Sequence, residues 1–181
     1  MSKMDAVKLL QQYIAPETDL YQIVYTHSRS VADKAISLAL KHPELNIDLV
    51  FLQEAALIHD IGVVKTNAPD IHCHGAYPYI CHGYLGREIV EKEGFPNHAL
   101  ICERHTGTGL SLSEILNKDL PLPHRDMYPV SLEEQLICFA DKFFSKSSLN
   151  VELELSLVRS KLEKYGIDGV RRFDSWCQLF L

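Results

Sequence analysis

The sequence lacks any long apolar run, since none of its segments approaches about 18 uninterrupted apolar residues. This argues against a membrane-spanning helix of ordinary length. The N-terminal stretch MSKMDAVKLLQQYI is amphipathic, and it has neither the apolar core nor the small-residue cleavage site of a signal peptide. We therefore expect a cytoplasmic protein that makes no membrane contact.

The sequence also lacks the cysteine patterns of small domains that depend on disulfides or a structural zinc ion. The five cysteines are odd in number and include no C-x-x-C pair, which argues against a disulfide framework and against a zinc ribbon. We expect reduced thiols. A chain of 181 residues can bury a sufficient core without disulfides or a structural metal. The most economical interpretation is a single domain over residues 1–181.

Basic residues are in the minority, with 18 Lys plus Arg against 24 Asp plus Glu and a net charge of −6. An acidic chain lacks the electrostatic footprint of a protein that binds nucleic acid in bulk. A local basic patch could still hold one phosphate-bearing ligand. Histidine, in contrast, is abundant: the chain has nine, and six of them fall between His59 and His105.

Apolar residues recur at a spacing near 3.6 through most of the chain, which predicts an all-α fold. Glycine and proline separate the helical stretches, with Gly62, Gly94 and Pro129 among the breaks. Two irregular segments, 64–81 and 106–130, are the natural positions for loops that face a substrate. The predicted helices cover about residues 3–14, 18–41, 47–63, 82–93, 97–105, 111–117 and 131–147, with two more beyond 150.

Several ionisable side chains lie on the apolar faces of these predicted helices. His27 shares its face with Val31 and Ala35, and Asp141 lies mid-helix in an apolar stretch. Burying an unpaired imidazole or carboxylate costs several kcal/mol, so each of these groups needs a partner. A single buried histidine is more often a hydrogen-bonded core residue than a ligand. It is the joint occurrence of these residues that favours a shared metal.

The same reasoning applies to His59, His82 and His105, which lie one or two helical turns from apolar residues. Asp60 lies at a helix end of the wrong polarity for capping. Four imidazoles and two carboxylates would be enough for two metals. Because a mixed nitrogen and oxygen set suits Fe, Mn, Zn, Co or Ni, we expect one or two divalent transition-metal ions. The predicted metal ligands are His27, His59, Asp60, His82, His105 and Asp141.

The order of these residues resembles the HD-domain metal-dependent phosphohydrolase superfamily, whose pattern is a histidine, a His-Asp pair and a distant aspartate. The matching positions are His27, His59-Asp60 and Asp141. His-Asp-Ile-Gly at 59–62 is the HDIG variant, and the chain looks like a small stand-alone member. The resemblance implies an HD-domain helical bundle as the core, about 20–147, with a C-terminal helical extension over 150–181.

In branches with two metals, extra histidines occur in segments that look like those around His82 and His105, so the resemblance implies that these residues bind a second metal. Cyclic-di-GMP phosphodiesterases have a Gly-Tyr-Pro signature that this sequence lacks. They also have a paired histidine where Arg104 stands and a lysine where Val63 stands. The resemblance therefore disfavours hydrolysis of cyclic di-GMP.

The activity that the resemblance implies is hydrolysis of a small phosphorylated metabolite or nucleotide, a phosphomonoester or a phosphodiester, by a metal-activated water. Asp60 would bridge the metals. Lys65 and Arg104 would hold the phosphate, with Lys142 as a further candidate, although surface solvation is the alternative role for each cation. The side chains at 72–74 would line the entrance.

Two alternatives use the same site. Related HD proteins are di-iron oxygenases that cleave small polyols or phosphonates, and iron content would distinguish such an enzyme. In the other alternative the metal is structural or regulatory, the protein is a non-catalytic module, and its C-terminal helices contact a partner or form a homodimer.

The contact surface of such a homodimer would come from the segment that begins at residue 151. Residues 151–157 alternate like a strand, but we favour a helix because no partner strand is predicted. The helical stripe is Val151, Leu155, Val158 and Leu162. We expect this stripe to pack on its own domain, and we expect Phe173, Trp176, Cys177 and Phe180 to close the core.

Overall fold

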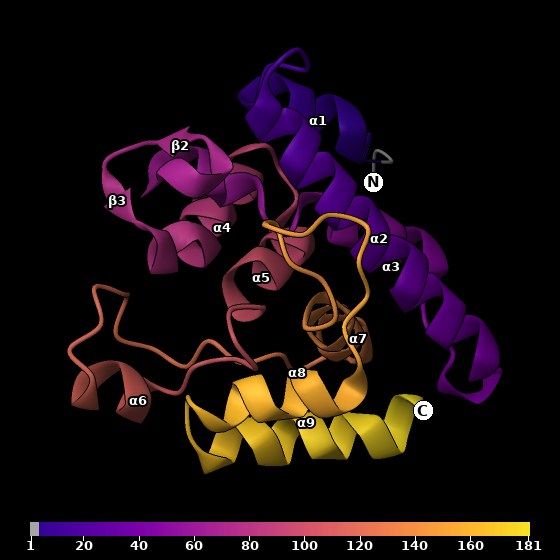
Figure 1. Ribbon diagram of the computed structural model, residues 1–181. Coiled ribbons are helices and arrows are strands. Elements are labelled where there is room, and N and C mark those ends of the chain that lie inside the picture. Colours follow the sequence, from indigo (N-terminus) through magenta and orange to yellow (C-terminus); the bar gives the residue numbers. More distant parts are fainter. Residues whose placement is uncertain (1–3) are drawn as a thin grey trace.

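The structure is a computed structural model that describes residues 4–181, and helices dominate it (Figure 1). The all-α prediction is therefore confirmed. The helices are α1 (Ala6–Tyr13), α2 (Asp19–Lys41), α3 (Leu49–Ile58), α4 (His82–Lys92), α5 (Pro96–Arg104), α6 (Leu112–Asn117), α7 (Leu132–Asp141), α8 (Leu155–Glu163) and α9 (Ile167–Phe180). Among the described residues, no helix is long and apolar enough to cross a membrane.

Helix starts are set by side chains that accept from otherwise unpaired main-chain N–H groups. Thr18 accepts from the amide of Tyr21 at the start of α2, and Ser131 accepts from that of Glu134 at the start of α7. These caps fix where the helices that carry His27 and Asp141 begin. The other capping side chains are Asp5, Asp48 and Ser111.

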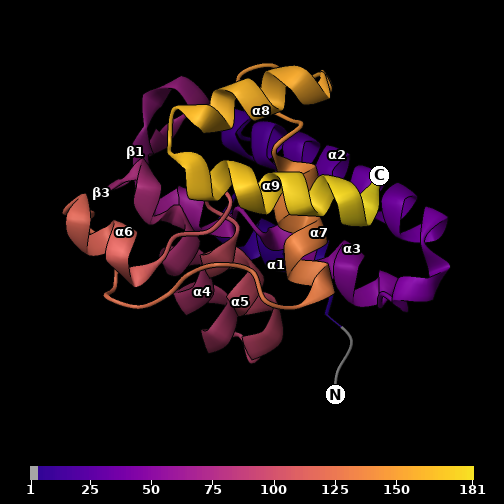
Figure 2. The ribbon, with the colours of Figure 1, turned by 90° about the horizontal axis from the view of Figure 1, so that it is seen from below.

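The helices pack around a shared core. Helix α2 packs on α3 and α7, α4 pairs with α5, and α3 and α7 both contact α5. Helices α8 and α9 pack against each other, and α9 crosses α7, as Figure 2 shows. Phe139 of α7 is fully buried, and its ring lies 5.2 Å from that of Phe173 and 5.8 Å from that of Phe180. The C-terminal helices thus share one core with the bundle.

The C-terminal segment matches the sequence prediction in part. Helix α8 begins at Leu155, so residues 151–154 are not helical. Within the predicted stripe, Val158 and Leu162 are buried, whereas Val151 and Leu155 are exposed. Packing on the parent domain is confirmed for the buried half, and the homodimer stays a prediction. Phe173, Trp176 and Phe180 are buried and close the core as predicted, with Cys177 half-buried.

Two predicted helices end earlier than expected, both at the site. The helix predicted over 47–63 ends at Ile58, and a 3₁₀ turn follows at Ile61–Lys65. The helix predicted over 131–147 ends at Asp141, so that residue is helix-terminal rather than mid-helix. The amides of residues 142–144 bond to carbonyls three positions earlier, and the Ser145 hydroxyl accepts from the amide of Ser147. After Asp141 the α-helical bonds to carbonyls four positions earlier thus give way to a tighter turn.

The segment at 64–81 contains a small sheet that the sequence analysis missed. Its strands are β1 (Thr66–Ala68), β2 (Cys73–His74) and β3 (Tyr77–Pro78), in the order β2-β1-β3. Strand β1 pairs antiparallel with β2 and parallel with β3. Strands of two or three residues are too short to show an alternating pattern. The sheet lies beside the start of α4 (Figure 1).

Candidate metal centre

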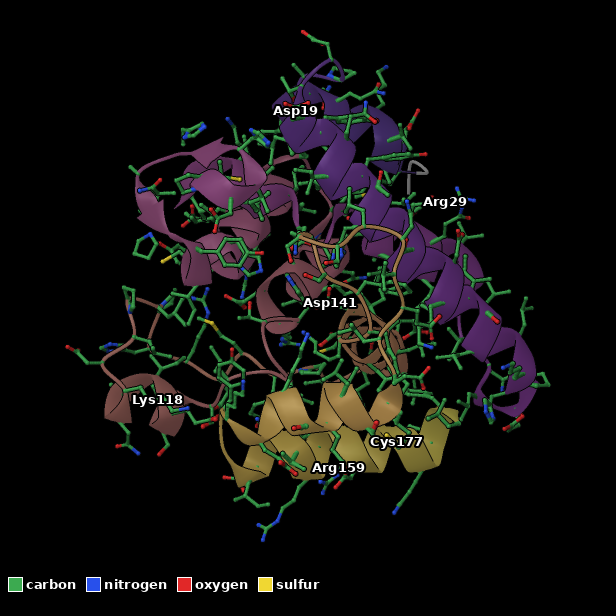
Figure 3. The ribbon with its side chains drawn as sticks, viewed as in Figure 1. Asp19, Arg29, Lys118, Asp141, Arg159 and Cys177 are labelled. Carbon is green, nitrogen blue, oxygen red and sulfur yellow. The ribbon has the colours of Figure 1, made fainter. Side chains whose placement is uncertain are left out.

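Five elements bring one or two ionisable side chains each to a single interior point. His27 comes from α2, His82 is the first residue of α4, and Asp141 is the last of α7. His59 and Asp60 follow α3, and His105 follows α5. Figure 3 shows Asp141 where these elements meet. The four histidines and Asp60 are buried, at most 5% exposed, although all are ionisable.

Gly62 explains how the loop after α3 comes so close to α4. A Cβ atom at this position would collide with the carbonyl oxygen of His82 and the amide nitrogen of Gly86. Only glycine lets the two main chains approach to this distance. The same approach places His82 within reach of Asp60, since Nε2 of His82 lies 3.6 Å from Oδ1 of Asp60.

The two oxygens of Asp60 face different groups of histidines. Oδ2 lies 3.0 Å from Nε2 of His59 and 3.3 Å from Nε2 of His27. Oδ1 lies 3.4 Å from Nε2 of His105. Asp141 joins the first group, with Oδ1 2.9 Å from Nε2 of His27. Two sets of donor atoms could each hold a metal: His27, His59, Asp60 and Asp141 form one, and Asp60, His82 and His105 form the other.

Main-chain carbonyls orient three of the histidine rings. The Nδ1 atoms of His59, His82 and His105 lie 2.6, 2.8 and 2.8 Å from the carbonyl oxygens of Ala56, Tyr79 and Cys102. A carbonyl only accepts, so each Nδ1 carries the proton, and in the neutral ring the lone pair is on Nε2. These Nε2 atoms point into the cluster, which is the orientation that metal-binding histidines adopt.

A metal fits this arrangement better than a proton does. Nε2 of His82 lies 3.0 Å from Nε2 of His105, so two lone pairs repel each other unless both bind a shared cation. Burial and the neighbouring His105 lower the pKa of His82 to about 3, and burial lowers that of His105 too. A proton is therefore a poor occupant at neutral pH. The nitrogen and oxygen donors suit a divalent transition metal.

The other half of the cluster is held together by charge. Burial alone would lower the pKa of His59, but the carboxylates of Asp60 and Asp141 outweigh it and raise that pKa to about 9. Burial alone would raise the pKa of Asp60, but His59 and Lys146 outweigh it and hold that pKa well below its usual range. Both oxygens of Asp60 are buried, and neither accepts a well-directed hydrogen bond from residues 4–181.

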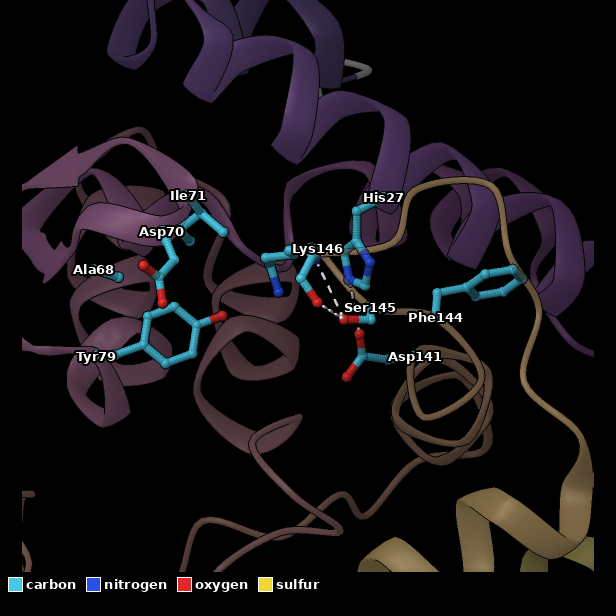
Figure 4. A pocket seen from close by; sticks show the side chains of 10 residues that line it. His27, Ala68, Asp70, Ile71, Tyr79, Asp141, Phe144, Ser145 and Lys146 are labelled. Atoms are coloured by element: carbon cyan, nitrogen blue, oxygen red, sulfur yellow. Dashed lines mark hydrogen bonds and ion pairs between the residues drawn. The ribbon is translucent and has the colours of Figure 1, made fainter.

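Lys146 belongs to the site although the sequence analysis did not name it. Its Nζ lies 2.6 Å from Oδ2 of Asp60, with 13% of the side chain exposed, and 5.9 Å from the ring centre of Tyr79. Figure 4 shows Lys146 between Tyr79 and His27. The prediction of a helix over 131–147 gave no reason to expect this role. In the structure α7 ends at Asp141, and the chain that follows brings Lys146 to Asp60. The serines on both sides of it, Ser145 and Ser147, were the available signal.

The cations expected at the phosphate lie in different surroundings. Lys65 is 40% exposed, with Nζ 3.8 Å from Oε2 of Glu88. Arg104 donates to both carboxylate oxygens of Glu134 at 3.0 and 2.9 Å. The structure therefore does not bring Lys65 or Arg104 into the ligand cluster. Lys142 does reach it, since its Nζ lies 2.7 Å from Oδ2 of Asp141.

The entrance also differs from the expectation. His72 and His74 line a separate cavity against α1 and α2, and Cys73 is buried. Asp70 and Ile71, in contrast, line a cavity of about 360 Å³ that reaches His27, Asp141 and Lys146 (Figure 4). The segment at 64–81 does face the centre, but the residues that do so include Asp70 and Ile71 rather than those at 72–74.

The protein is thus a helical bundle whose buried histidine and aspartate side chains could hold metal ions. The chain belongs to the HD domain family, whose pattern matches residues 24–145. The resemblance noted from the sequence is thereby confirmed.

Two known proteins are similar to this chain in sequence. An uncharacterized protein of Methanocaldococcus jannaschii is 33% identical over 144 residues, which cover 78% of this chain and 76% of the relative. A tRNA (cytidine(56)-2′-O)-methyltransferase of Thermoplasma volcanium is 28% identical over 143 residues, and the match covers 78% of this chain but 37% of that protein. The chain thus spans little more than a third of the methyltransferase.

Solved structures with the same fold include the HD domain of the Listeria monocytogenes phosphodiesterase PgpH. The likeness has a TM-score of 0.55 at 15% identity and covers 93% of both chains. A second structure of that domain, in complex with cyclic-di-AMP, has a TM-score of 0.54 at 15% identity and covers 96% of this chain and 94% of that one. At this identity the likeness establishes the shared fold.

Proposed function

We propose that the protein is a metal-dependent hydrolase of phosphate esters, and that its substrate is a small phosphorylated metabolite or nucleotide. The observation that carries the proposal is the pair of Nε2 atoms of His82 and His105, 3.0 Å apart beside a carboxylate oxygen of Asp60. His27, His59, Asp60 and Asp141 would hold one divalent cation, and Asp60, His82 and His105 a second. Such cations lower the pKa of a bound water and neutralise phosphate oxygens.

The protein side chains have distinct parts in this proposal. Asp60 offers one oxygen to each ligand group, so it couples the two. Lys146 and Lys142 supply positive charge at the edge of the centre, where an anionic phosphate would lie. We assign them the role that the sequence suggested for Lys65 and Arg104. Burial of the histidines excludes bulk water and strengthens each of these interactions.

The comparisons support a phosphate ester as the substrate class. PgpH is named a phosphodiesterase, and one of its structures contains cyclic-di-AMP. For this chain the same chemistry is a proposal, and both monoesters and diesters belong in its test. Methyl transfer is no part of the proposal, because the match covers 37% of the methyltransferase.

The test is hydrolysis of a panel of monoesters and diesters by protein loaded with Mn²⁺ or Co²⁺. Monoester hydrolysis is measured as phosphate release, and diester hydrolysis as formation of the phosphomonoester and the alcohol. We expect turnover of at least one panel member and its loss in Asp60→Asn. The matched control is Asp33→Asn, because the Asp33 side chain is 59% exposed on α2. A metal-replete protein that hydrolyses no panel member would refute the proposal.

A di-iron oxygenase could use the same ligands, and the cations at the centre argue against one that acts on a neutral polyol. Lys142 and Lys146 both lie within 2.7 Å of a ligand carboxylate oxygen, an environment that favours an anionic substrate. Oxygen consumption by the iron-loaded protein, with a mixed-valent paramagnetic signal and no hydrolysis of any ester, would favour the oxygenase instead.

A further inference from the structure

Two cavities of different character meet at the metal centre. The smaller, of about 360 Å³, is lined by His27, Asp141 and Lys146. The larger, of about 620 Å³, reaches the centre at His82 and Asp141. Tyr79, Asp141, Phe144 and Ser145 line both. A ligand with one group at the metals could therefore extend its remaining part into either cavity.

The smaller cavity suits polar groups. Besides His27 and Asp141 it is lined by Asp70, Ser145, Lys146 and Ser147, while Ala68, Ile71, Tyr79 and Phe144 form its apolar part. The Lys146 ammonium group lies 2.6 Å from Oδ2 of Asp60. An apolar ligand body placed here would remove these charged groups from water, which is unfavourable.

The larger cavity has mostly aliphatic and aromatic walls. Its apolar lining includes Ile80, Leu110, Leu120, Phe144, Leu153 and Leu162. It runs from the centre between α6 and the C-terminal helices, and Lys118 and Lys161 also line it. Thr106 and Thr108 add hydroxyl groups along one wall. A large apolar cavity with a few polar groups is the usual form of a site for an organic ligand.

We propose that the larger cavity binds the alcohol part of the substrate, and that this part carries an apolar body such as an aromatic ring. The inference rests on the proposed function and narrows its substrate class. With the phosphate at the metals, the polar side of the ester faces the smaller cavity and the organic body fills the larger. On hydrolysis the water oxygen bonds to phosphorus, the P–O bond to the alcohol breaks, and the alcohol leaves with a proton that comes from the water.

The test compares the binding of phenylphosphonate and methylphosphonate, which have no P–O ester bond to the organic group and so measure binding without turnover. We expect calorimetry on the Mn²⁺-loaded protein to give at least about tenfold tighter binding of phenylphosphonate, because its ring is transferred from water to apolar walls. Leu110→Trp fills the cavity and should remove this preference while leaving the affinity for methylphosphonate unchanged. The control is Leu116→Trp, since Leu116 is 52% exposed on α6 and outside the lining.

Equal binding of the two phosphonates by the wild-type protein would overturn the inference, whatever the variants do. So would an unchanged preference in both Leu110→Trp and a second cavity-filling variant, Leu120→Trp, each checked for metal content and for its circular dichroism spectrum. Failure of both phosphonates to bind the metal-loaded protein would refute the proposed function itself and the inference with it. The two failures are therefore distinguishable.

Discussion

Nε2 of His82 lies 3.0 Å from Nε2 of His105, while Nδ1 of each ring faces a main-chain carbonyl oxygen at 2.8 Å. The carbonyls fix the proton on the outer nitrogen of each ring, so the inner nitrogens offer lone pairs to the same small volume. Ring nitrogens in this arrangement repel each other unless both bind a shared cation. The main chain, through three-residue turns at the ends of helices, thereby prepares the donors before any ion arrives.

The two ligand groups predict separable losses of metal. We expect the wild-type protein to bind two metal ions per chain, one for each ligand group. His82→Gln or His105→Gln should lose one and keep the other, whereas Asp60→Asn should lose both, because Asp60 belongs to both groups. Elemental analysis after dialysis measures this, with His124→Gln as the control at an exposed histidine. Full retention of both metals by His82→Gln would contradict the assignment.

Lys146→Met should destabilise the metal-stripped protein and increase the stabilisation that metal provides. In the stripped protein the variant leaves the buried Asp60 carboxylate without a cation at 2.6 Å, and breaking a buried pair costs about 3 kcal/mol or more. For a chain of this size that lowers Tm by roughly 6–12 °C. Thermal unfolding with and without chelator measures both effects.

Lys65→Met is the matched control for that experiment. The Lys65 side chain is 40% exposed and its partner Glu88 is 59% exposed, and exposed pairs contribute about 0–1 kcal/mol. Its Tm should therefore change little, with or without metal. Equal effects of the two substitutions would show that Lys146 has no special relation to the centre.

Gly62→Ala should impair metal binding more than its size suggests. Its Cβ would collide with the main chain of His82 and Gly86, so α4 must move and carry His82 away from Asp60. We expect a lower melting temperature and loss of the metal held by His82 and His105. Gly94→Ala is a useful comparison, because a Cβ there meets no atom within 4 Å, although its φ of +88° adds local strain. Normal metal content in Gly62→Ala would contradict the close approach.

Phe173→Ala should destabilise the whole domain rather than only its C-terminal helices. Phe173 is fully buried, and its ring lies 5.2 Å from that of Phe139. Truncating such a core phenylalanine costs about 3–5 kcal/mol. Urea unfolding should remain a single transition at a lower midpoint, whereas Ile167→Ala, at a position 61% exposed on the same helix, should have little effect. A separate early transition in Phe173→Ala would mean that α8 and α9 unfold by themselves.

The sequence was sufficient to predict which helix faces carry the clustered histidines, but not where each chain turns after them. His27 and His82 lie among residues at helical spacing, and periodicity places such residues reliably on one face. Lys65 and Arg104 were selected because they are close in sequence to His59 and His105. One residue along a helix is a rotation of about 100°, which directs Arg104 to Glu134, and the 3₁₀ turn after Asp60 directs Lys65 toward Glu88.

Lys146 is a residue that the sequence did not indicate. The apolar spacing before it continued the helix in the prediction, whereas α7 ends at Asp141 and the next three amides bond to carbonyls three positions earlier. Such a local change of hydrogen bonding leaves little trace in hydrophobic periodicity. The small sheet at 66–78 was not predicted either, because the pairing of its strands depends on contacts between segments rather than on any repeating pattern.

The contact of main chain with main chain at Gly62 also bears on which ion the centre would select. Because no side chain separates the loop after α3 from α4, the main chains that carry Asp60 and His82 are held at a fixed separation. Such a rigid frame discriminates among ions by radius. Ions with bonds of about 2.0–2.2 Å to nitrogen and oxygen suit it, whereas Ca²⁺, which needs about 2.3–2.6 Å and more oxygen ligands, does not.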